Sequence, residues 1–316
     1  MTASEKLRTN FYERFARAAN DAAVGWAVLS GIEGYPAQIG RDLDVTCRSR
    51  SDANLLGKIF VSCLHECRFR WIVFPSPIWG KRIIGITEKY ETVELHIVHP
   101  VRVVSVSLSP DWHKLVYEGG LFPTDPLLRY FKRCMIPALI GGEPWRIKCS
   151  QVRQPATLPW WMRRTALQIA GGRDLAWNER LALFSAFIVS HPANFLLNSW
   201  WWLRRRNIRR QYPAAPVYQL DGMIDPENFL SLAKRSLSEV FTGFACVDDD
   251  DPRRVMALQA IQRLVYLTKK RSDISEVQAL PVDVRDEAKL LDFIVESFSD
   301  FNERWRPQAH SPKGSL

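Results

Sequence analysis

The chain has 316 residues, of which 47% are hydrophobic and 24% are charged, and its formal net charge is +9 with a pI near 9.4. This composition excludes an intrinsically disordered chain, and the length is enough for two domains that each have a core. The positive charge favours an anionic partner, such as a nucleotide, a nucleic acid or an acidic membrane surface. No apolar leader opens the sequence, so we expect a cytoplasmic protein.

The first elements are predicted from their patterns. Residues 4–23 carry apolar side chains at intervals of three or four, with charged residues between them, which predicts an amphipathic helix. Trp26–Ser30 is a compact apolar run that predicts a strand. A second strand is expected from Asp42 onward, and the glycines at positions 31, 34 and 40 make the connection a loop.

Asp42 and Asp44 carry the chemistry of this stretch. Side chains two positions apart on a strand point to the same face, so the two carboxylates lie side by side. Two close negative charges repel each other unless a cation lies between them, and Mg²⁺ or Mn²⁺ prefers such oxygen ligands. Gly31 has no side chain and allows backbone N–H groups to approach a triphosphate. The alternative is that both aspartates are solvated residues on one face of a sheet.

Further along, residues 51–67 are predicted as a helix, and residues 70–74, 82–86 and 92–98 as strands. In the last of these strands Glu94 and His96 alternate with apolar neighbours and share a face. We expect Glu94 to be the third metal ligand, and His96 is the next candidate. Cys63 and Cys67 invite a zinc interpretation, but the second cysteine or histidine pair that such a site needs is not found in the sequence.

This order of features resembles the DNA polymerase β-like nucleotidyltransferase superfamily, in the minimal bacterial type found in surface-polysaccharide loci. The shared features are a strand that ends in glycine, a loop of about ten residues, an Asp-x-Asp strand and an acidic residue on a later strand. Here they are Gly31, Asp42, Asp44 and Glu94. The Gly-Ser pair of the family stands in reverse order, as Ser30-Gly31.

The resemblance implies a metal-dependent transfer of a nucleoside monophosphate from an NTP to a hydroxyl or phosphate acceptor, such as a sugar or glycan precursor. Asp42, Asp44 and Glu94 would be the catalytic residues, and the same three with His96 would bind Mg²⁺ or Mn²⁺. The nucleotide-binding residues are then expected to be Ser30, Gly31, Gly40 and Arg41. For Arg41, directly before Asp42, the alternative is an ordinary surface position.

The rest of the chain is predicted to change in character. Residues 101–108 read as another strand of the same sheet, residues 125–140 as a helix, and the proline-containing residues 143–159 as a linker. After the linker we expect helices alone, at residues 161–170, 177–190, 193–210, 226–241, 252–270 and 284–302. The predicted fold is α+β: a nucleotidyltransferase-like mixed sheet with flanking helices over residues 1–142, an all-α domain over residues 160–306, and a disordered tail over residues 307–316.

A cluster of tryptophans and arginines is the most unusual feature of the second half. Trp200, Trp201 and Trp202 precede Arg204, Arg205 and Arg206. These residues could bind the inner face of a membrane, with nucleic acid as a less favoured partner, or they could form part of a helix hairpin in the core of the domain. The alternative function for the whole chain is therefore a catalytically inactive binding or scaffold protein that docks on a membrane or a partner through this segment.

Overall fold

The computed structural model describes most of the first 135 residues and selected segments after them. These are residues 2–75, 81–98, 101–103, 106–135, short stretches between 154 and 167, 175–190, 217–220, 225–238, 240–241, 243–246, 264–268, 279–282 and 286–304. Backbone contacts divide the chain into two compact units. The first consists of Met1–Cys63, Pro75–Arg82 and Val93–Arg206, and the second of Leu64–Phe74, Ile83–Thr92 and Asn207–Leu316.

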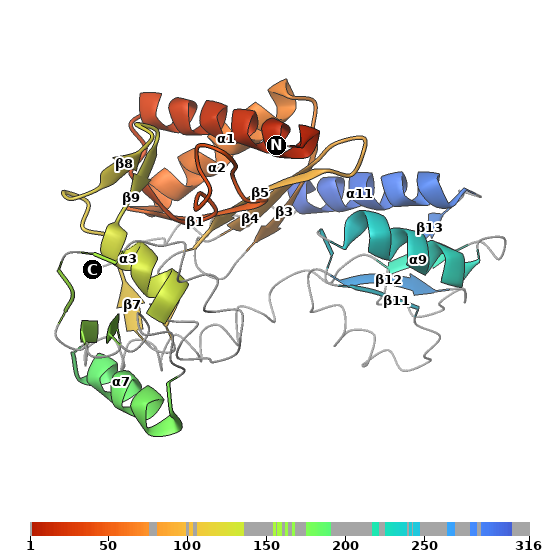
Figure 1. The fold of residues 1–316 in the computed structure, drawn as a ribbon. Helices are drawn as coiled ribbons and strands as arrows, with labels where there is room; N and C mark the ends of the chain where they lie inside the picture. Colours follow the sequence, from red (N-terminus) through yellow and green to blue (C-terminus); the bar gives the residue numbers. More distant parts are fainter. Residues whose placement is uncertain are drawn as a thin grey trace, which may run out of the picture. The chain divides into compact units, whose positions relative to one another are not determined.

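The N-terminal part of the chain forms a seven-stranded mixed sheet (Figure 1). Its strands lie in the order β3-β4-β5-β2-β1-β9-β8. In chain order their bounds are β1 Trp26–Ser30, β2 Asp42–Cys47, β3 Arg70–Pro75, β4 Lys81–Ile86, β5 Thr92–Ile97, β8 Val116–Glu118 and β9 Phe122–Thr124. The central strand β2 pairs antiparallel with β1 and parallel with β5. The first five strands were all predicted from the sequence, to within one residue at each end where both ends were predicted.

Two helices cover one face of this sheet, α1 Ala3–Asp21 and α2 Arg50–Glu66 (Figure 1). Both were predicted from the spacing of their apolar residues. At the start of α1 the Thr2 side chain accepts from the Glu5 N–H while the Glu5 carboxylate accepts from the Thr2 N–H, which satisfies two helix-end donors. On the buried side Phe15 makes edge contacts with Trp26 and Phe60, so the helices and the sheet share one aromatic core.

The prediction for residues 101–108 was wrong. Instead of one more strand of the large sheet, Val101–Val103 (β6) and Val106–Leu108 (β7) pair antiparallel as a separate two-stranded sheet. Alternating apolar and polar residues have the same period in one long strand and in the two arms of a hairpin, so the pattern could not separate them. After β9, helix α3 Pro126–Tyr130 begins at the cap Asp125 and continues as a π-helix, η1 Phe131–Met135.

The second part of the chain is not all-α in the residues that the structure describes. Four strands, β10 Val217–Leu220, β11 Gly243–Cys246, β12 Leu264–Thr268 and β13 Ala279–Val282, form a parallel sheet in the order β11-β12-β10-β13. The helix predicted over residues 252–270 is therefore wrong where β12 lies. Strands of a parallel sheet read as short continuous apolar runs, which periodicity cannot distinguish from a piece of a buried helix.

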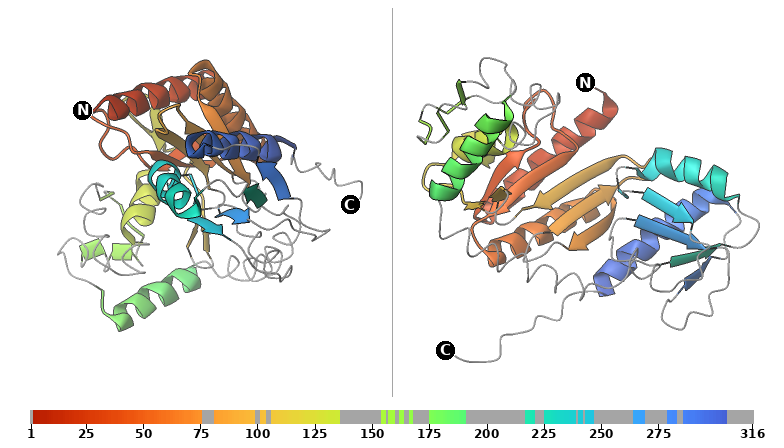
Figure 2. Two further views of the ribbon diagram at one scale, coloured as in Figure 1. Left: turned by 90° about the vertical axis from the view of Figure 1, so that its right-hand side faces the viewer. Right: turned by 90° about the horizontal axis from the view of Figure 1, so that it is seen from below.

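Two of the predicted helices, α9 Pro226–Leu237 and α11 Glu287–Arg304, accompany these strands in the second unit, and both are visible in the two views of Figure 2. Their apolar faces meet the strands in one core that includes Tyr218, Phe229, Val265, Leu291 and Phe298. In the first unit the predicted helix at residues 177–190 is confirmed as α7 Trp177–Ser190. Most of the predicted linker and helix at residues 161–170, all of the helix at residues 193–210, and the tail lie outside the described residues.

Candidate functional site

Four of the predicted site residues lie on two neighbouring strands of the first unit. The register of the parallel strands β2 and β5 places Asp42 across from Glu94, and Asp44 across from His96. The apolar residues between them are buried. Because side chains alternate along a strand, the four polar residues belong to the opposite face of the sheet.

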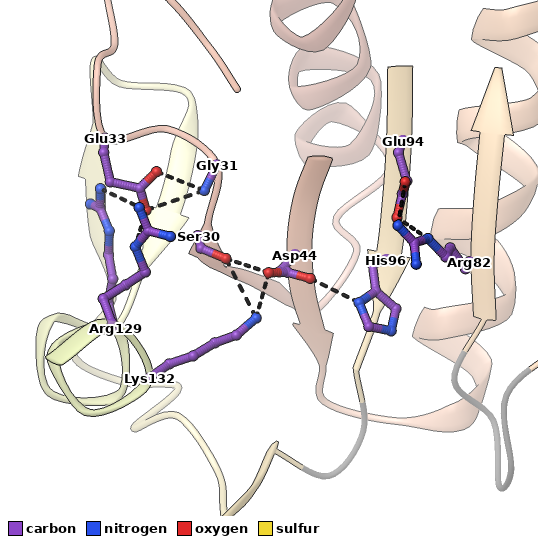
Figure 3. A network of polar contacts seen from close by, with 10 residues as sticks. Ser30, Gly31, Glu33, Asp44, Arg82, Glu94, His96, Arg129 and Lys132 are labelled. Carbon is purple, nitrogen blue, oxygen red and sulfur yellow. Dashed lines mark hydrogen bonds and ion pairs between the residues drawn. The ribbon is translucent and has the colours of Figure 1, made fainter. Parts of the chain in front are cut away.

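The Asp44 carboxylate is the centre of the network in Figure 3. Lys132 Nζ lies 2.6 Å from Asp44 Oδ2, and the Ser30 hydroxyl donates a hydrogen bond to the same oxygen. His96 Nδ1 lies 2.8 Å from Asp44 Oδ1. Lys132 also donates to Ser30 Oγ at 3.4 Å. Ser30 and Asp44 are register partners across β1 and β2, so the sheet itself brings hydroxyl and carboxylate together.

These partners set the protonation states at the centre of the site. Burial raises the pKa of Asp44, but the charge of Lys132 and the hydrogen bond from His96 outweigh it and hold the pKa well below its ordinary value. Asp44 is therefore ionised at neutral pH. An ionised carboxylate can only accept hydrogen bonds, so Nδ1 of His96 carries the proton that they share.

Glu94 is held by an arginine of the adjacent strand β4. Nη2 of Arg82 donates to Glu94 Oε2 at 2.6 Å, and Nε of Arg82 contacts Oε1. The Glu94 side chain is only 1% exposed, so loss of Arg82 would leave a buried and unpaired charge. The Tyr12 hydroxyl accepts from the Glu94 N–H at 2.8 Å and donates to the carbonyl oxygen of Arg41. Burial raises the pKa of Tyr12, which keeps its hydroxyl protonated.

The other predicted nucleotide-binding residues surround the loop between β1 and β2. Gly31 has φ +108°, and a Cβ there would clash with the carbonyl oxygen of Asp42, so the turn requires glycine. Gly40 donates its N–H to the Gly31 carbonyl oxygen at 2.7 Å and closes the loop at its base. Arg41 contributes its carbonyl oxygen, which accepts a hydrogen bond from the Tyr12 hydroxyl. The Gly31 N–H points to the carboxylate of Glu33.

The basic residues of the site were not expected from the sequence. Lys132 and Arg82 contact the carboxylates described above, while Arg129 and Arg133 lie near Glu33. A signal was present, because Arg129, Lys132 and Arg133 are spaced i, i+3 and i+4 within a segment that was predicted as a helix. This spacing places three cations on one helix face.

The predicted metal ligands do not fit a metal ion as they lie. Within the described residues no group of three or more His, Cys, Asp or Glu side chains is placed to hold an ion, and this applies to Cys63 and Cys67 too. Asp44 and Glu94 have Lys132 and Arg82 as partners instead. Binding of Mg²⁺ or Mn²⁺ stays a prediction, which requires these two cations to leave the carboxylates.

The predicted membrane contact is not tested by the described residues. Trp200, Trp201, Trp202 and the arginines at positions 204–206 lie outside them. Among the helices that the structure does describe, none has the length and apolar character needed to cross a bilayer. Peripheral binding to the inner face of a membrane remains a prediction from the sequence.

Comparison of the chain with protein-family models, with curated proteins and with solved structures finds no match. The likeness to nucleotidyltransferases therefore rests on Gly31, Asp42, Asp44 and Glu94 and stays a prediction.

Proposed function

We propose that the first unit binds the phosphate groups of a nucleotide beside the loop between β1 and β2, and that Lys132 supplies the positive charge at this site. The observation that carries the proposal is the position of the Lys132 ammonium, 2.6 Å from Asp44 and 3.4 Å from the Ser30 hydroxyl. A protein cation thus stands at Asp44, where the resemblance implies a metal ion. The function is then binding, in a fold like that of a nucleotidyltransferase.

The ammonium group of Lys132 is suited to bind a phosphate oxygen. An ammonium group has three N–H donors, and Asp44 and Ser30 are the two acceptors that surround it within the described chain. The third N–H can donate to a ligand. The Lys132 side chain is 21% exposed, so a phosphate can approach it without a large rearrangement. Charge-assisted hydrogen bonds of this kind are stronger than neutral ones, especially where little water competes.

The test is calorimetric binding of the four common NTPs in the presence of EDTA. We expect the wild type to bind at least one NTP without a divalent ion, and Lys132→Ala to lose this binding. Lys114→Ala is the matched control, because Lys114 also pairs with an aspartate but its side chain is 82% exposed. Binding that needs Mg²⁺ and is the same in wild type and Lys132→Ala would refute the proposal.

A second candidate function is metal-dependent nucleotidyl transfer, as the resemblance implies. The register that aligns Asp42 with Glu94, next to Asp44, favours it because three carboxylates then occupy adjacent positions on one sheet face. It predicts release of pyrophosphate from an NTP only with Mg²⁺ or Mn²⁺ and a hydroxyl or phosphate acceptor. Asp42→Asn should abolish this release while leaving metal-free NTP binding intact. An absence of release with sugar and sugar-phosphate acceptors would leave binding as the better account.

A further inference from the structure

The carboxylate of Glu33 lies among three donors of the first unit. Its two oxygens accept from the Gly31 N–H at 3.0 and 3.2 Å. Arg133 Nε lies 3.1 Å from Glu33 Oε1, and Arg129 Nη2 lies 4.0 Å from the same oxygen. Figure 3 shows Arg129 reaching from its helix toward Glu33 and Gly31, beside Lys132. A backbone amide and two guanidinium groups thus surround one anion.

These donors are the ones that proteins use to bind phosphate. A guanidinium presents several N–H groups in one plane and matches two oxygens of a phosphate at once. A backbone N–H at a glycine turn with positive φ can approach an oxyanion closely, since no side chain is in the way. In chemical terms the Glu33 carboxylate stands in for a ligand anion.

Glu33 alone does not satisfy the donors of the cluster formed by the Gly31 N–H, Arg129 and Arg133. Arg129 also pairs with Glu118, but the Glu118 side chain is 37% exposed whereas that of Arg129 is 8% exposed. The Nε of Arg129 is buried and has no hydrogen-bond acceptor within the described part of the chain. A buried donor without an acceptor costs free energy, so an anion with more oxygens than a carboxylate would be favoured here.

We propose that Gly31, Arg129 and Arg133 form a phosphoryl-binding subsite, and that Glu33 occupies it when no ligand is bound. This deepens the proposed function and rests on it, because the subsite would take a phosphate of the nucleotide whose neighbouring phosphate meets Lys132. A phosphoryl group carries a charge of about −1.5 to −2 and three acceptor oxygens, so it can engage both guanidiniums and displace the single carboxylate. Glu33 then lowers the affinity for every phosphate ligand, since only molecules with Glu33 released can bind it.

Titration with inorganic pyrophosphate in EDTA tests this proposal. We expect Glu33→Gln to bind pyrophosphate about tenfold more tightly than the wild type, because the competing charge is gone. Glu33→Gln with Arg133→Gln should lose that gain. Glu13→Gln is the matched control: it removes the same charge from a glutamate that contacts Arg17 and Tyr35 outside the cluster, and it should leave the affinity unchanged.

Equal pyrophosphate affinity in Glu33→Gln and Glu13→Gln would overturn the subsite. A second measurement uses the wild type alone: pyrophosphate should shift the amide resonance of Gly31, and an unmoved resonance at saturating pyrophosphate would also overturn it. The two proposals can fail separately. NTP binding that depends on Lys132 but not on Glu33 would leave only the proposed function, whereas pyrophosphate binding that depends on Glu33 without any NTP binding would leave only the subsite.

Discussion

The two units of the chain differ in the kind of side chain that their strands bury. In the first unit, Asp44 and Glu94 on neighbouring strands are largely buried and paired with Lys132 and Arg82. In the second unit, the core that joins strands and helices consists of apolar and aromatic residues. Replacing a buried ion pair with apolar residues is often neutral or stabilising, so the fold does not need charges at these positions. Under the proposed function, these two buried pairs serve ligand binding.

The largest expected effect in this comparison comes from the apolar core of the second unit. Phe241 is 1% exposed, and its ring lies 4.8 Å from that of Phe298 and 5.7 Å from that of Phe244. Phe241→Ala should lower the free energy of unfolding by about 3–5 kcal/mol, measured by urea denaturation, because it leaves a cavity. Phe241→Leu should lower the free energy of unfolding by clearly less. If both variants lost nucleotide binding at temperatures where they remain folded, the separation of roles between the units would be wrong.

The next largest effect comes from the Asp44 pair in the first unit. Asp44→Asn should lower the free energy of unfolding at pH 7 by roughly 2–4 kcal/mol, because it leaves Lys132 without its counter-ion. Since the folded-state pKa of Asp44 lies below its ordinary value of 3.8, the stabilisation is present above about pH 4 and is lost as the pH falls toward the folded-state pKa. The difference between wild type and variant should therefore shrink in acid.

Urea denaturation of both proteins from pH 7 to pH 3 measures this dependence. Asp111→Asn is the control, because the Asp111–Lys114 pair is exposed and screened by solvent, so its difference from wild type should stay small at every pH. A difference for Asp44→Asn that does not change with pH would show that the aspartate acts through packing and not through its charge.

The sequence predicted the elements of the first unit more completely than those of the second, and the reasons are physical. The strand Trp26–Ser30 and the helix Trp177–Ser190 were predicted with the observed bounds, because a local apolar pattern determines them. The strand Leu264–Thr268 was missed, since it directly follows apolar residues at helical spacing and its own run is short. A parallel strand is stabilised by neighbouring strands that are distant in the sequence, so a local pattern does not predict it.

The same limit applies to the candidate site. Alternation along each strand was enough to group Asp42 with Asp44 and Glu94 with His96, and the register of β2 and β5 aligns the two pairs. The partner of Asp44 could not be predicted in this way. Lys132 reaches it from a helix that follows five further strands of the large sheet, and only the tertiary fold brings them together.

A smaller effect is expected for the hydroxyl that ties the starts of β2 and β5 together. Tyr12→Phe removes one donor to the Arg41 carbonyl and one acceptor of the Glu94 N–H while the ring stays in place. The Glu94 N–H still donates to the Arg41 carbonyl oxygen at 3.0 Å. The free energy of unfolding should fall by about 1 kcal/mol, because these backbone groups lose one of their two partners and keep the other. NTP affinity should fall as well if the register of these strands positions the site. Unchanged affinity with reduced stability would assign Tyr12 to the scaffold alone.

The smallest effect should come from the ion pair of the second unit. Arg70 Nη1 lies 2.6 Å from Asp292 Oδ1, and its guanidinium lies 5.8 Å from the centre of the Tyr90 ring, but the side chains of Arg70 and Asp292 are 26% and 47% exposed. Solvent screens such a pair, so a double-mutant cycle of Arg70→Met and Asp292→Asn should give a coupling of less than about 1 kcal/mol. A coupling above about 2 kcal/mol would mean that charge also stabilises the second unit. The units would then differ only in where their charged pairs lie, and this difference would no longer link the pairs of the first unit to ligand binding.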